Sequence, residues 1–192
     1  MKKGILFVLS GPSGVGKNTV LDELFKDFAG VSYSVSATTR EARNGEIEGE
    51  DYFFITEEKF KEIEADNGFI ESAVVHGHYY GTPKKFVDKK LAEGEDIILE
   101  IDTQGAKQVR EKYPDAVYIF LLPPSLEELE NRLDKRGSEN NKSKSIRLKN
   151  ARKELKEVHN YDYEVINDSL SKAVREIKKI IIAEQKRRDQ DD

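Results

Sequence analysis

Residues 5–19, ILFVLSGPSGVGKNT, carry the strongest structural signal in this chain. Leu6–Leu9 is a short, continuous apolar run, which is typical of a strand that is buried on both faces. The glycine-rich segment after it matches G-x-x-x-x-G-K and leads into a stretch with helical character. A strand before this pattern and a helix after it are the context of a phosphate-binding loop, so we predict one here. The alternative is a glycine-rich turn with a surface lysine.

The predicted loop comprises Gly11, Pro12, Ser13, Gly14, Val15, Gly16, Lys17, Asn18 and Thr19. Gly14 and Gly16 lack a Cβ, so the backbone amides can turn toward a phosphate, and the start of the following helix adds partial positive charge. Lys17 would reach the β- and γ-phosphates of a bound nucleotide. Asn18 stands where Ser or Thr usually binds Mg²⁺. Its carbonyl oxygen is also a suitable ligand and Thr19 adds a hydroxyl one place later, so we predict Asn18 and Thr19 as Mg²⁺ ligands.

Composition narrows the class of protein. The 192 residues are close to one ordinary domain length, and 37% apolar residues are compatible with a buried sheet. A net charge of −5 argues against a nucleic-acid polymer as partner. The chain has no cysteine, its N-terminal apolar run is too short for a signal peptide, and no apolar stretch approaches a membrane span. We expect one domain, no membrane partner and a cytoplasmic location.

Two further apolar runs, Ile97–Ile101 and Val117–Leu122, predict a parallel sheet with helices between its strands, an α/β fold. The capping box SLEE at residues 125–128 predicts a helix to about Arg136. Thr82 places a capping hydroxyl before a proline at another helix start. Apolar residues at helical spacing predict a final helix from Leu170 to about Lys186.

Residues 36–82 interrupt this alternation, because they are rich in turn formers, aromatic residues and charges. We expect an inserted subdomain of short strands with one helix at about Glu57–Asp66. The segment GSENNKSKS, residues 137–145, is small and polar without apolar anchors, which predicts a loop.

Arg40 and Arg43 lie three residues apart in the inserted segment, and Tyr52 and Tyr80 follow. Such a group could clamp a phosphate monoester, because arginine pairs with phosphate oxygens in a forked arrangement. Residue types alone leave this evenly matched with solvated arginines beside aromatic residues that pack the subdomain.

Glu100 and Asp102 alternate with apolar residues in LEID, so both side chains should leave one face of a strand near its C-terminal end. Parallel sheets bind ligands at that end. Asp102 is the better candidate for a partner of Mg²⁺ or Lys17, and a structural salt bridge is the alternative.

A series of motifs makes the chain resemble the guanylate kinase family over nearly its whole length. They are GPSGVGK, SATTREARNGEIEGEDYFF (36–54), FIE (69–71), YYGT (79–82), LEIDTQG (99–105), RLDKRG (132–137) and VIND (165–168). In the family pattern aspartate usually stands at Glu100, and acidic residues are usual at positions 140–142, so the chain departs from it at both places.

The resemblance assigns the phosphate of GMP to four side chains, Arg40, Arg43, Tyr52 and Tyr80. It assigns guanine to three others, Ser36, Glu71 and Thr82, and places Glu100 and Asp102 at the same nucleotide. Guanine presents N1–H and a 2-amino group as adjacent donors, which an ionised Glu71 can accept, whereas adenine has no N1–H. A surface charge is the alternative for Glu71.

By the same resemblance, Arg136 and Arg147 lie at the γ-phosphate on a mobile lid, and Arg132 lies on the ATP side. Ordinary exposed helix arginines are the alternative. Asn167 resembles the position that contacts adenine, although an Asn-Asp turn would need no ligand.

The resemblance implies Mg²⁺-dependent phosphoryl transfer from ATP to GMP, and to dGMP, by positioning and charge stabilisation. It implies one domain, 1–192, with a core (about 1–35, 83–131 and 148–192), a GMP-binding subdomain (about 36–82) and a lid (about 132–147). The alternatives are a P-loop kinase of a phosphorylated sugar and a non-catalytic guanylate-kinase-like domain that binds phosphopeptides. Such domains typically lose the loop lysine. The expected partners are GMP and ATP, and the chain could be a monomer or a homodimer.

Overall fold

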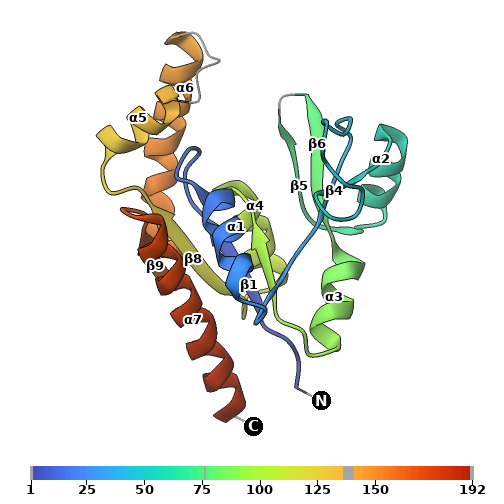
Figure 1. The fold of residues 1–192 in the computed structure, drawn as a ribbon. Helices are drawn as coiled ribbons and strands as arrows, with labels where there is room; N and C mark the ends of the chain where they lie inside the picture. The colour runs from blue at the N-terminus through green and yellow to red at the C-terminus, as the bar shows by residue number, and fades with distance from the viewer. Residues whose placement is uncertain (1, 76, 136–140, 191–192) are drawn as a thin grey trace.

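The computed structural model describes residues 2–75, 77–135 and 141–190, and side chains within these ranges except at 134, 135 and 141–147. The chain forms two lobes, a larger one that contains both termini and a smaller one around β4, β5, β6 and α2 (Figure 1). None of the helices in the described ranges has the length and apolar character needed to cross a bilayer.

The larger lobe is built on a five-stranded sheet in the order β2-β7-β1-β8-β9, and every pairing in it is parallel. Its strands are β1 (Leu6–Ser10), β2 (Ser32–Tyr33), β7 (Ile97–Glu100), β8 (Val117–Leu122) and β9 (Tyr163–Ile166). The predicted parallel sheet is confirmed, and so are the three strands predicted from continuous apolar runs.

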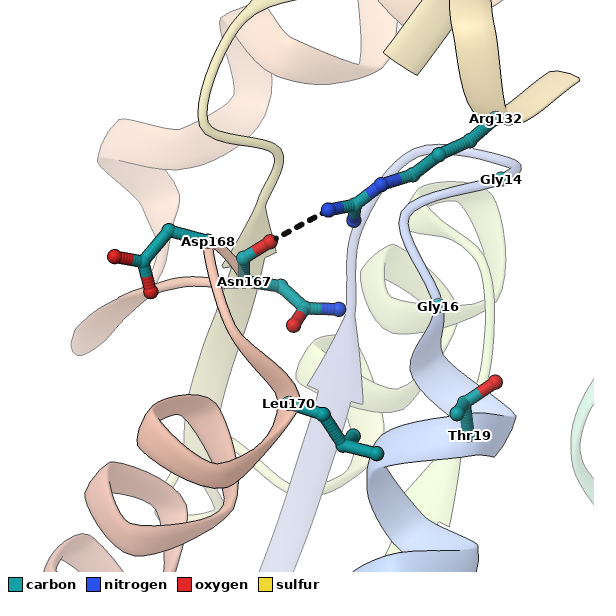
Figure 2. A pocket seen from close by; sticks show the side chains of 7 residues that line it. All are labelled: Gly14, Gly16, Thr19, Arg132, Asn167, Asp168 and Leu170. Carbon is teal, nitrogen blue, oxygen red and sulfur yellow. Dashed lines mark hydrogen bonds between the residues drawn. The ribbon is translucent and has the colours of Figure 1, made fainter. Parts of the chain in front are cut away.

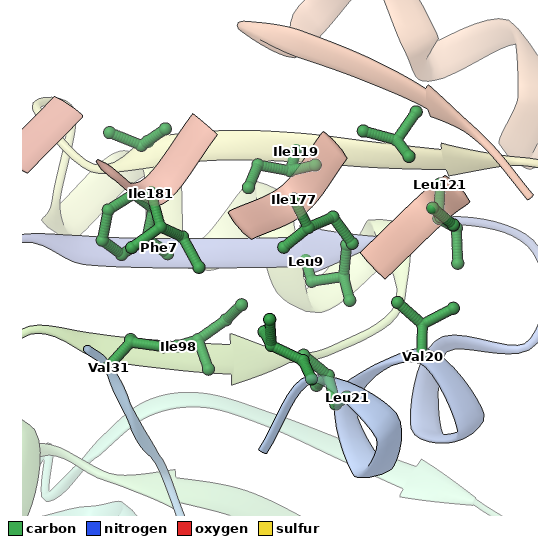
Figure 3. Packing of buried hydrophobic residues seen from close by; sticks show 14 of the residues in the cluster. Phe7, Leu9, Val20, Leu21, Val31, Ile98, Ile119, Leu121, Ile177 and Ile181 are labelled. Carbon is green, nitrogen blue, oxygen red and sulfur yellow. The ribbon is translucent and has the colours of Figure 1, made fainter. Parts of the chain in front are cut away.

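One face of this sheet is covered by α1 (Lys17–Asp27) and α7 (Leu170–Gln190). Phe7 and Leu9 of β1 point to this face and are fully buried beside Ile177 of α7 (Figure 3). The final helix is therefore confirmed, and it runs four residues beyond the predicted Lys186.

The opposite face is covered by α3 (Lys84–Ala92) and α4 (Thr103–Lys112). Leu6 and Val8 of β1 pack there, because successive side chains of a strand point to opposite faces. Burial on both sides explains why these strands read as unbroken apolar runs.

The smaller lobe holds a mixed four-stranded sheet in the order β4-β3-β6-β5. Its strands are β3 (Ser36–Thr38), β4 (Tyr52–Phe54), β5 (Phe69–Val75) and β6 (His78–Pro83). The predicted helix is present as α2 (Glu57–Ala65), whose Phe60 stacks on Phe69 with ring centroids 4.3 Å apart. This pair anchors a small core of its own, separate from the larger sheet.

Between β8 and β9, the described residues form α5 (Leu126–Lys135), α6 (Asn141–Glu154) and the 3₁₀ helix η1 (Leu155–Asn160). The hydroxyl contact of the predicted capping box of α5 is confirmed, because Glu128 N donates to Ser125 Oγ at 3.1 Å. The loop predicted over 137–145 is wrong from residue 141 onward, since α6 begins there. The first residues of α6 are polar and would not form a stable helix alone. Ala151, further along the same helix, packs against α5, and this contact stabilises the whole of α6.

The predicted capping role of Thr82 is also wrong. α3 begins at Lys84 after Pro83, without a side-chain hydrogen bond at its cap. The Thr82 hydroxyl instead donates to a carboxylate oxygen of Glu71 at 2.7 Å. A buried carboxylate is costly unless it accepts hydrogen bonds. The bond to Glu71 is therefore favoured over a helix cap at Thr82.

Ile177→Ala should lower the free energy of unfolding by about 2–5 kcal/mol, because it leaves a cavity at a fully buried position of α7. Ile47→Ala is the matched control at a side chain that is 53% exposed, and it should change stability by about 0.5 kcal/mol or less. Urea unfolding followed by circular dichroism measures both. Equal losses in the two variants would contradict the packing of α7 on the sheet.

Candidate active site

The predicted phosphate-binding loop, residues 11–16, leaves the sheet where open parallel sheets bind ligands. It links β1 to α1, and β1 lies between β7 and β8, where the order of the strands reverses. Gly16 has a φ of +98°, and a Cβ there would lie 2.9 Å from Asn167 Nδ2. A Cβ at Gly11 would lie 2.4 Å from the backbone oxygen of Leu121. The local packing therefore demands glycine at both positions.

Arg132 and Asn167 brace this loop (Figure 2). The buried Asn167 Nδ2 donates to the backbone oxygen of Val15 at 2.9 Å, and Arg132 Nη1 donates to the same oxygen at 3.2 Å. Arg132 Nη2 also donates to the backbone oxygen of Asn167 at 2.9 Å, the dashed line in Figure 2. The two residues line a cavity of about 300 Å³, here called the outer cavity, together with Gly14, Gly16, Thr19, Asp168 and Leu170.

Lys17 is the first residue of α1, and its Nζ donates to the backbone oxygen of Gly11 at 2.8 Å. On the other side of the loop, Ser13 N donates to a carboxylate oxygen of Glu154 at 3.3 Å. Burial raises the pKa of the Glu154 carboxyl, although the bond from Ser13 and the charge of Lys17 oppose this shift. The loop is thus in contact with the end of α6.

A second cavity, of about 370 Å³, lies between the loop and the smaller lobe and is here called the central cavity. It brings together predicted residues from both lobes: Gly11, Ser13, Lys17, Asn18, Ser36, Tyr52, Glu71, Tyr80, Glu100 and Asp102. Residues predicted to bind the phosphate donor and residues predicted to bind the acceptor therefore line one cavity.

Glu71 is a buried carboxylate of the central cavity, with 7% of its surface exposed. One of its oxygens accepts the hydroxyl of Thr82. A Cβ on Gly105 would lie 3.1 Å from the other oxygen, so α4 approaches this carboxylate closely. Burial raises the pKa of Glu71, and the bond from Thr82 only partly opposes the shift. A ligand that donates hydrogen bonds to this carboxylate would offset the cost of its desolvation.

Arg40 lies at the centre of a polar and aromatic cluster on the smaller lobe. Its Nε donates to Tyr80 Oη at 3.3 Å, and its Nη2 donates to a carboxylate oxygen of Glu46 at 2.8 Å. The guanidinium carbon lies 5.5 Å from the centroid of the Tyr52 ring, which contacts the Tyr80 ring edge to face. Three of the four residues predicted to hold an acceptor phosphate are therefore in contact.

The fourth of these residues, Arg43, lines a neighbouring cavity of about 470 Å³, here called the loop cavity. Tyr52 and Glu100 line both the loop cavity and the central cavity, so the two spaces adjoin. Arg43 is therefore close to the predicted phosphate clamp but faces it from the adjoining cavity.

Glu100 and Asp102 both line the central cavity, in agreement with the expectation that they leave one face at the end of a strand. Glu100 is the last residue of β7 and lies opposite Leu9 of β1. Asp102 caps α4, where its Oδ1 accepts from Gly105 N at 2.7 Å. The contact that positions Asp102 is thus a helix cap rather than the salt bridge considered as the alternative.

The two predicted metal ligands are not brought together, because Asn18 lines the central cavity and Thr19 lines the outer cavity. Within the described ranges, no group of three His, Cys, Asp or Glu side chains could hold a metal ion. The central cavity does carry oxygen donors, from Asn18, Glu100 and Asp102. Mg²⁺ keeps several waters and takes few protein ligands beside substrate phosphates, so this donor set fits Mg²⁺.

Of the predicted lid arginines, Arg136 lies outside the described residues, and so does the side chain of Arg147. The backbone of residue 147 belongs to α6. Because α6 ends at Glu154, the helix that carries Arg147 contacts the phosphate-binding loop at its C-terminal end.

Two carboxylates at the site were not predicted from the sequence. Glu46 accepts from Arg40 Nη2 and also from the backbone amide of Arg43, at 2.7 Å. Glu46 stands in the motif at residues 36–54 that carries the family resemblance, but that resemblance assigned no role to it. Glu154 gave no signal, because it is one of many charged residues on α6.

Comparisons with known proteins cover both lobes. A model of the family described as guanylate kinase matches residues 3–184. A guanylate kinase of Caldanaerobacter subterraneus subsp. tengcongensis is 52% identical over 188 residues, which cover 98% of this chain and 91% of that protein. One of Clostridium acetobutylicum is also 52% identical, with coverage of 98% and 90%.

A crystal structure of guanylate kinase from Anaplasma phagocytophilum matches this fold with a TM-score of 0.77 and 37% sequence identity. The match covers 96% of this chain and 87% of that chain. Sequence and fold therefore agree over nearly the whole length, and the chain belongs to the guanylate kinase family.

Proposed function

We propose that this chain transfers the γ-phosphoryl group of ATP to GMP, and to dGMP, to give ADP and the nucleoside diphosphate. Membership of the guanylate kinase family supports the reaction. One geometric observation supports the site: Lys17 of the loop and Glu71 of the smaller lobe line the same cavity. Phosphoryl transfer depends mainly on holding donor and acceptor in line, and a shared cavity allows this.

Guanine recognition is assigned to Ser36, Glu71 and Thr82. The buried carboxylate of Glu71 would accept from the guanine N1–H and 2-amino group, while the Thr82 hydroxyl already donates to it. Adenine would leave the carboxylate without these donors in a site that excludes water, which costs binding energy. The base site therefore selects guanine by hydrogen-bond polarity.

The acceptor phosphate is assigned to Arg40, Arg43, Tyr52 and Tyr80. The contacts among Arg40, Tyr52 and Tyr80 support this assignment, because they hold one guanidinium and two phenols at a common place. Arg43 lines the adjoining loop cavity, and its guanidinium is assigned to the same phosphate.

ATP is assigned to the phosphate-binding loop, with its adenine in the outer cavity beside Arg132 and Asn167. Lys17 and the lid residues Arg136 and Arg147 would offset the negative charge of the transferring group, which is the main electrostatic demand of the reaction. This division gives one domain with a core, an acceptor subdomain at about 36–82 and a lid at about 132–147.

Mg²⁺ would be held by the side chain of Asn18 and the phosphates of ATP, with Glu100 and Asp102 reaching it through water. When bound, Mg²⁺ neutralises charge on the β- and γ-phosphates. The residues of the chain orient the two nucleotides and exclude water, so that the phosphoryl group passes to GMP instead of to water.

A coupled assay of ADP release from ATP, with GMP, AMP, CMP and UMP offered separately, tests this function. We expect turnover with GMP alone, and only when Mg²⁺ is present. Lys17→Ala is the control for a contaminating kinase, and its rate should fall by orders of magnitude because a cation at the donor phosphates is lost. Purified protein without turnover of GMP would overturn the proposal.

Glu71→Gln should weaken GMP binding on the order of 10–100-fold, because an amide cannot accept both guanine donors as the carboxylate does. AMP binding should change much less, since adenine gains nothing from the carboxylate. Calorimetric titration of both nucleotides into both proteins measures the selectivity. An unchanged ratio of GMP to AMP affinity would remove Glu71 from guanine recognition.

The affinity for guanosine should fall as the pH is lowered, and the fall should begin above the ordinary glutamate pKa of 4.5, because burial raises the pKa of Glu71. Only the ionised carboxylate accepts both guanine donors, and this form is lost as the pH drops through the raised pKa. Guanosine is the probe because a phosphate monoester itself titrates at about pH 6. The same titration on Glu71→Gln should be flat. Matching pH profiles for the two proteins would refute this explanation.

A further inference from the structure

Glu46 makes two hydrogen bonds that join the two predicted phosphate-binding arginines. One carboxylate oxygen accepts from Arg40 Nη2 at 2.8 Å, and the other accepts from the backbone amide of Arg43 at 2.7 Å. Glu46 N in turn donates to the backbone oxygen of Arg43 at 3.1 Å, which closes the turn between them. One side chain therefore links the guanidinium of Arg40 to the backbone that carries Arg43.

This ion pair is more enclosed than the usual surface pair. The side chains of Arg40 and Glu46 are 12% and 20% exposed, whereas both members of most other Lys and Arg pairs in the described ranges are more open. The bonds from Arg40 and Arg43 lower the pKa of Glu46, so the carboxylate is ionised at neutral pH. The guanidinium is thus held against a fixed negative charge.

Within the described chain, protein acceptors take three of the five N–H donors of the Arg40 guanidinium. They are Tyr80 Oη, the backbone oxygen of Glu41 and the carboxylate of Glu46. One N–H on each terminal nitrogen is then left for a ligand, and two such donors can meet two oxygens of a phosphate. The contacts orient the guanidinium without using its whole donor capacity.

A carboxylate beside a phosphate site needs an explanation, because it repels the ligand that the arginines attract. The segment between β3 and β4 has no regular secondary structure at residues 41–43, and long arginine side chains lose much rotamer freedom when they bind. A residue that orders both arginines in the free protein removes that loss from the binding step. For Glu46 to favour binding, this ordering has to outweigh the repulsion.

We propose that Glu46 is the positioning residue of the acceptor-phosphate site: it holds the Arg40 guanidinium and the Arg43 backbone in the arrangement that receives the phosphate of a nucleoside monophosphate. The proposal rests on the function proposed above and deepens it. Glu46 touches neither the base nor the phosphate, and it acts only through the two arginines.

The test compares GMP with guanosine, which has the same base and no phosphate. In Glu46→Gln, the amide is nearly isosteric but cannot accept both bonds with a full negative charge. We expect GMP affinity to fall on the order of tenfold, guanosine affinity to stay within about twofold, and the KM for ATP to stay unchanged. Isothermal titration calorimetry gives the affinities, and thermal unfolding verifies that the variant is folded.

Two further variants separate position from charge. Glu50→Gln removes the same charge from an exposed side chain that lines the same loop cavity, and it should leave the ratio of GMP to guanosine affinity unchanged. Glu46→Asp keeps the charge but withdraws the carboxylate by one methylene, so it should lose GMP affinity to a similar extent as Glu46→Gln.

Several outcomes would overturn the proposal. Tighter GMP binding in Glu46→Gln would show that repulsion outweighs ordering. Equal losses for GMP and guanosine would show that Glu46 only maintains the subdomain, and a wild-type ratio in Glu46→Asp would show that position is unimportant. Failure of the proposed function gives a different result, namely wild-type protein that binds GMP but does not phosphorylate it.

Discussion

The parallel pairing of β1 with β7 is the constraint on which both halves of the site depend. Leu9 lies opposite Glu100 in this pairing, so both strands end at the same edge of the sheet. From that edge one chain segment enters the phosphate-binding loop and the other runs through Asp102 into α4. A slip of one residue would exchange the faces of buried side chains, so the register is strongly fixed. The sheet thereby places Lys17 at the end of the loop together with Glu100 and Asp102, and all three line the central cavity.

The larger lobe could be predicted from sequence because its signals are local. A continuous apolar run needs no partner to be recognised, and the glycine spacing of residues 11–16 reports its own backbone geometry. Two local predictions failed because tertiary contacts decided them. The Thr82 hydroxyl bonds to the buried Glu71 instead of capping α3, and the start of α6 depends on packing at Ala151. Glu46 belongs to a recognised motif, but its role could not be predicted, because its two acceptor contacts exist only in the folded turn.

Residues assigned to the donor nucleotide also make hydrogen bonds that stabilise the fold around the loop. Arg132 donates to the Glu128 carboxylate and to the backbone oxygens of Val15 and Asn167, so its guanidinium is oriented before any ligand arrives. Asn167 is buried and bonded to the same loop. Such side chains lose their freedom during folding, and binding then costs less conformational entropy. Arg40, on the acceptor side, is likewise oriented by protein contacts, with Tyr80 and Glu46.

Gly105 of α4 makes the surroundings of Glu71 in the smaller lobe depend on the larger lobe. A methyl group there would lie 3.1 Å from the oxygen of Glu71 that faces α4, so the larger lobe supplies part of the wall around the acid proposed to bind guanine. A side chain at position 105 would require this carboxylate to shift. If Glu71 binds the base as proposed, a graft of the smaller lobe onto another core would have to bring the first turn of α4 with it.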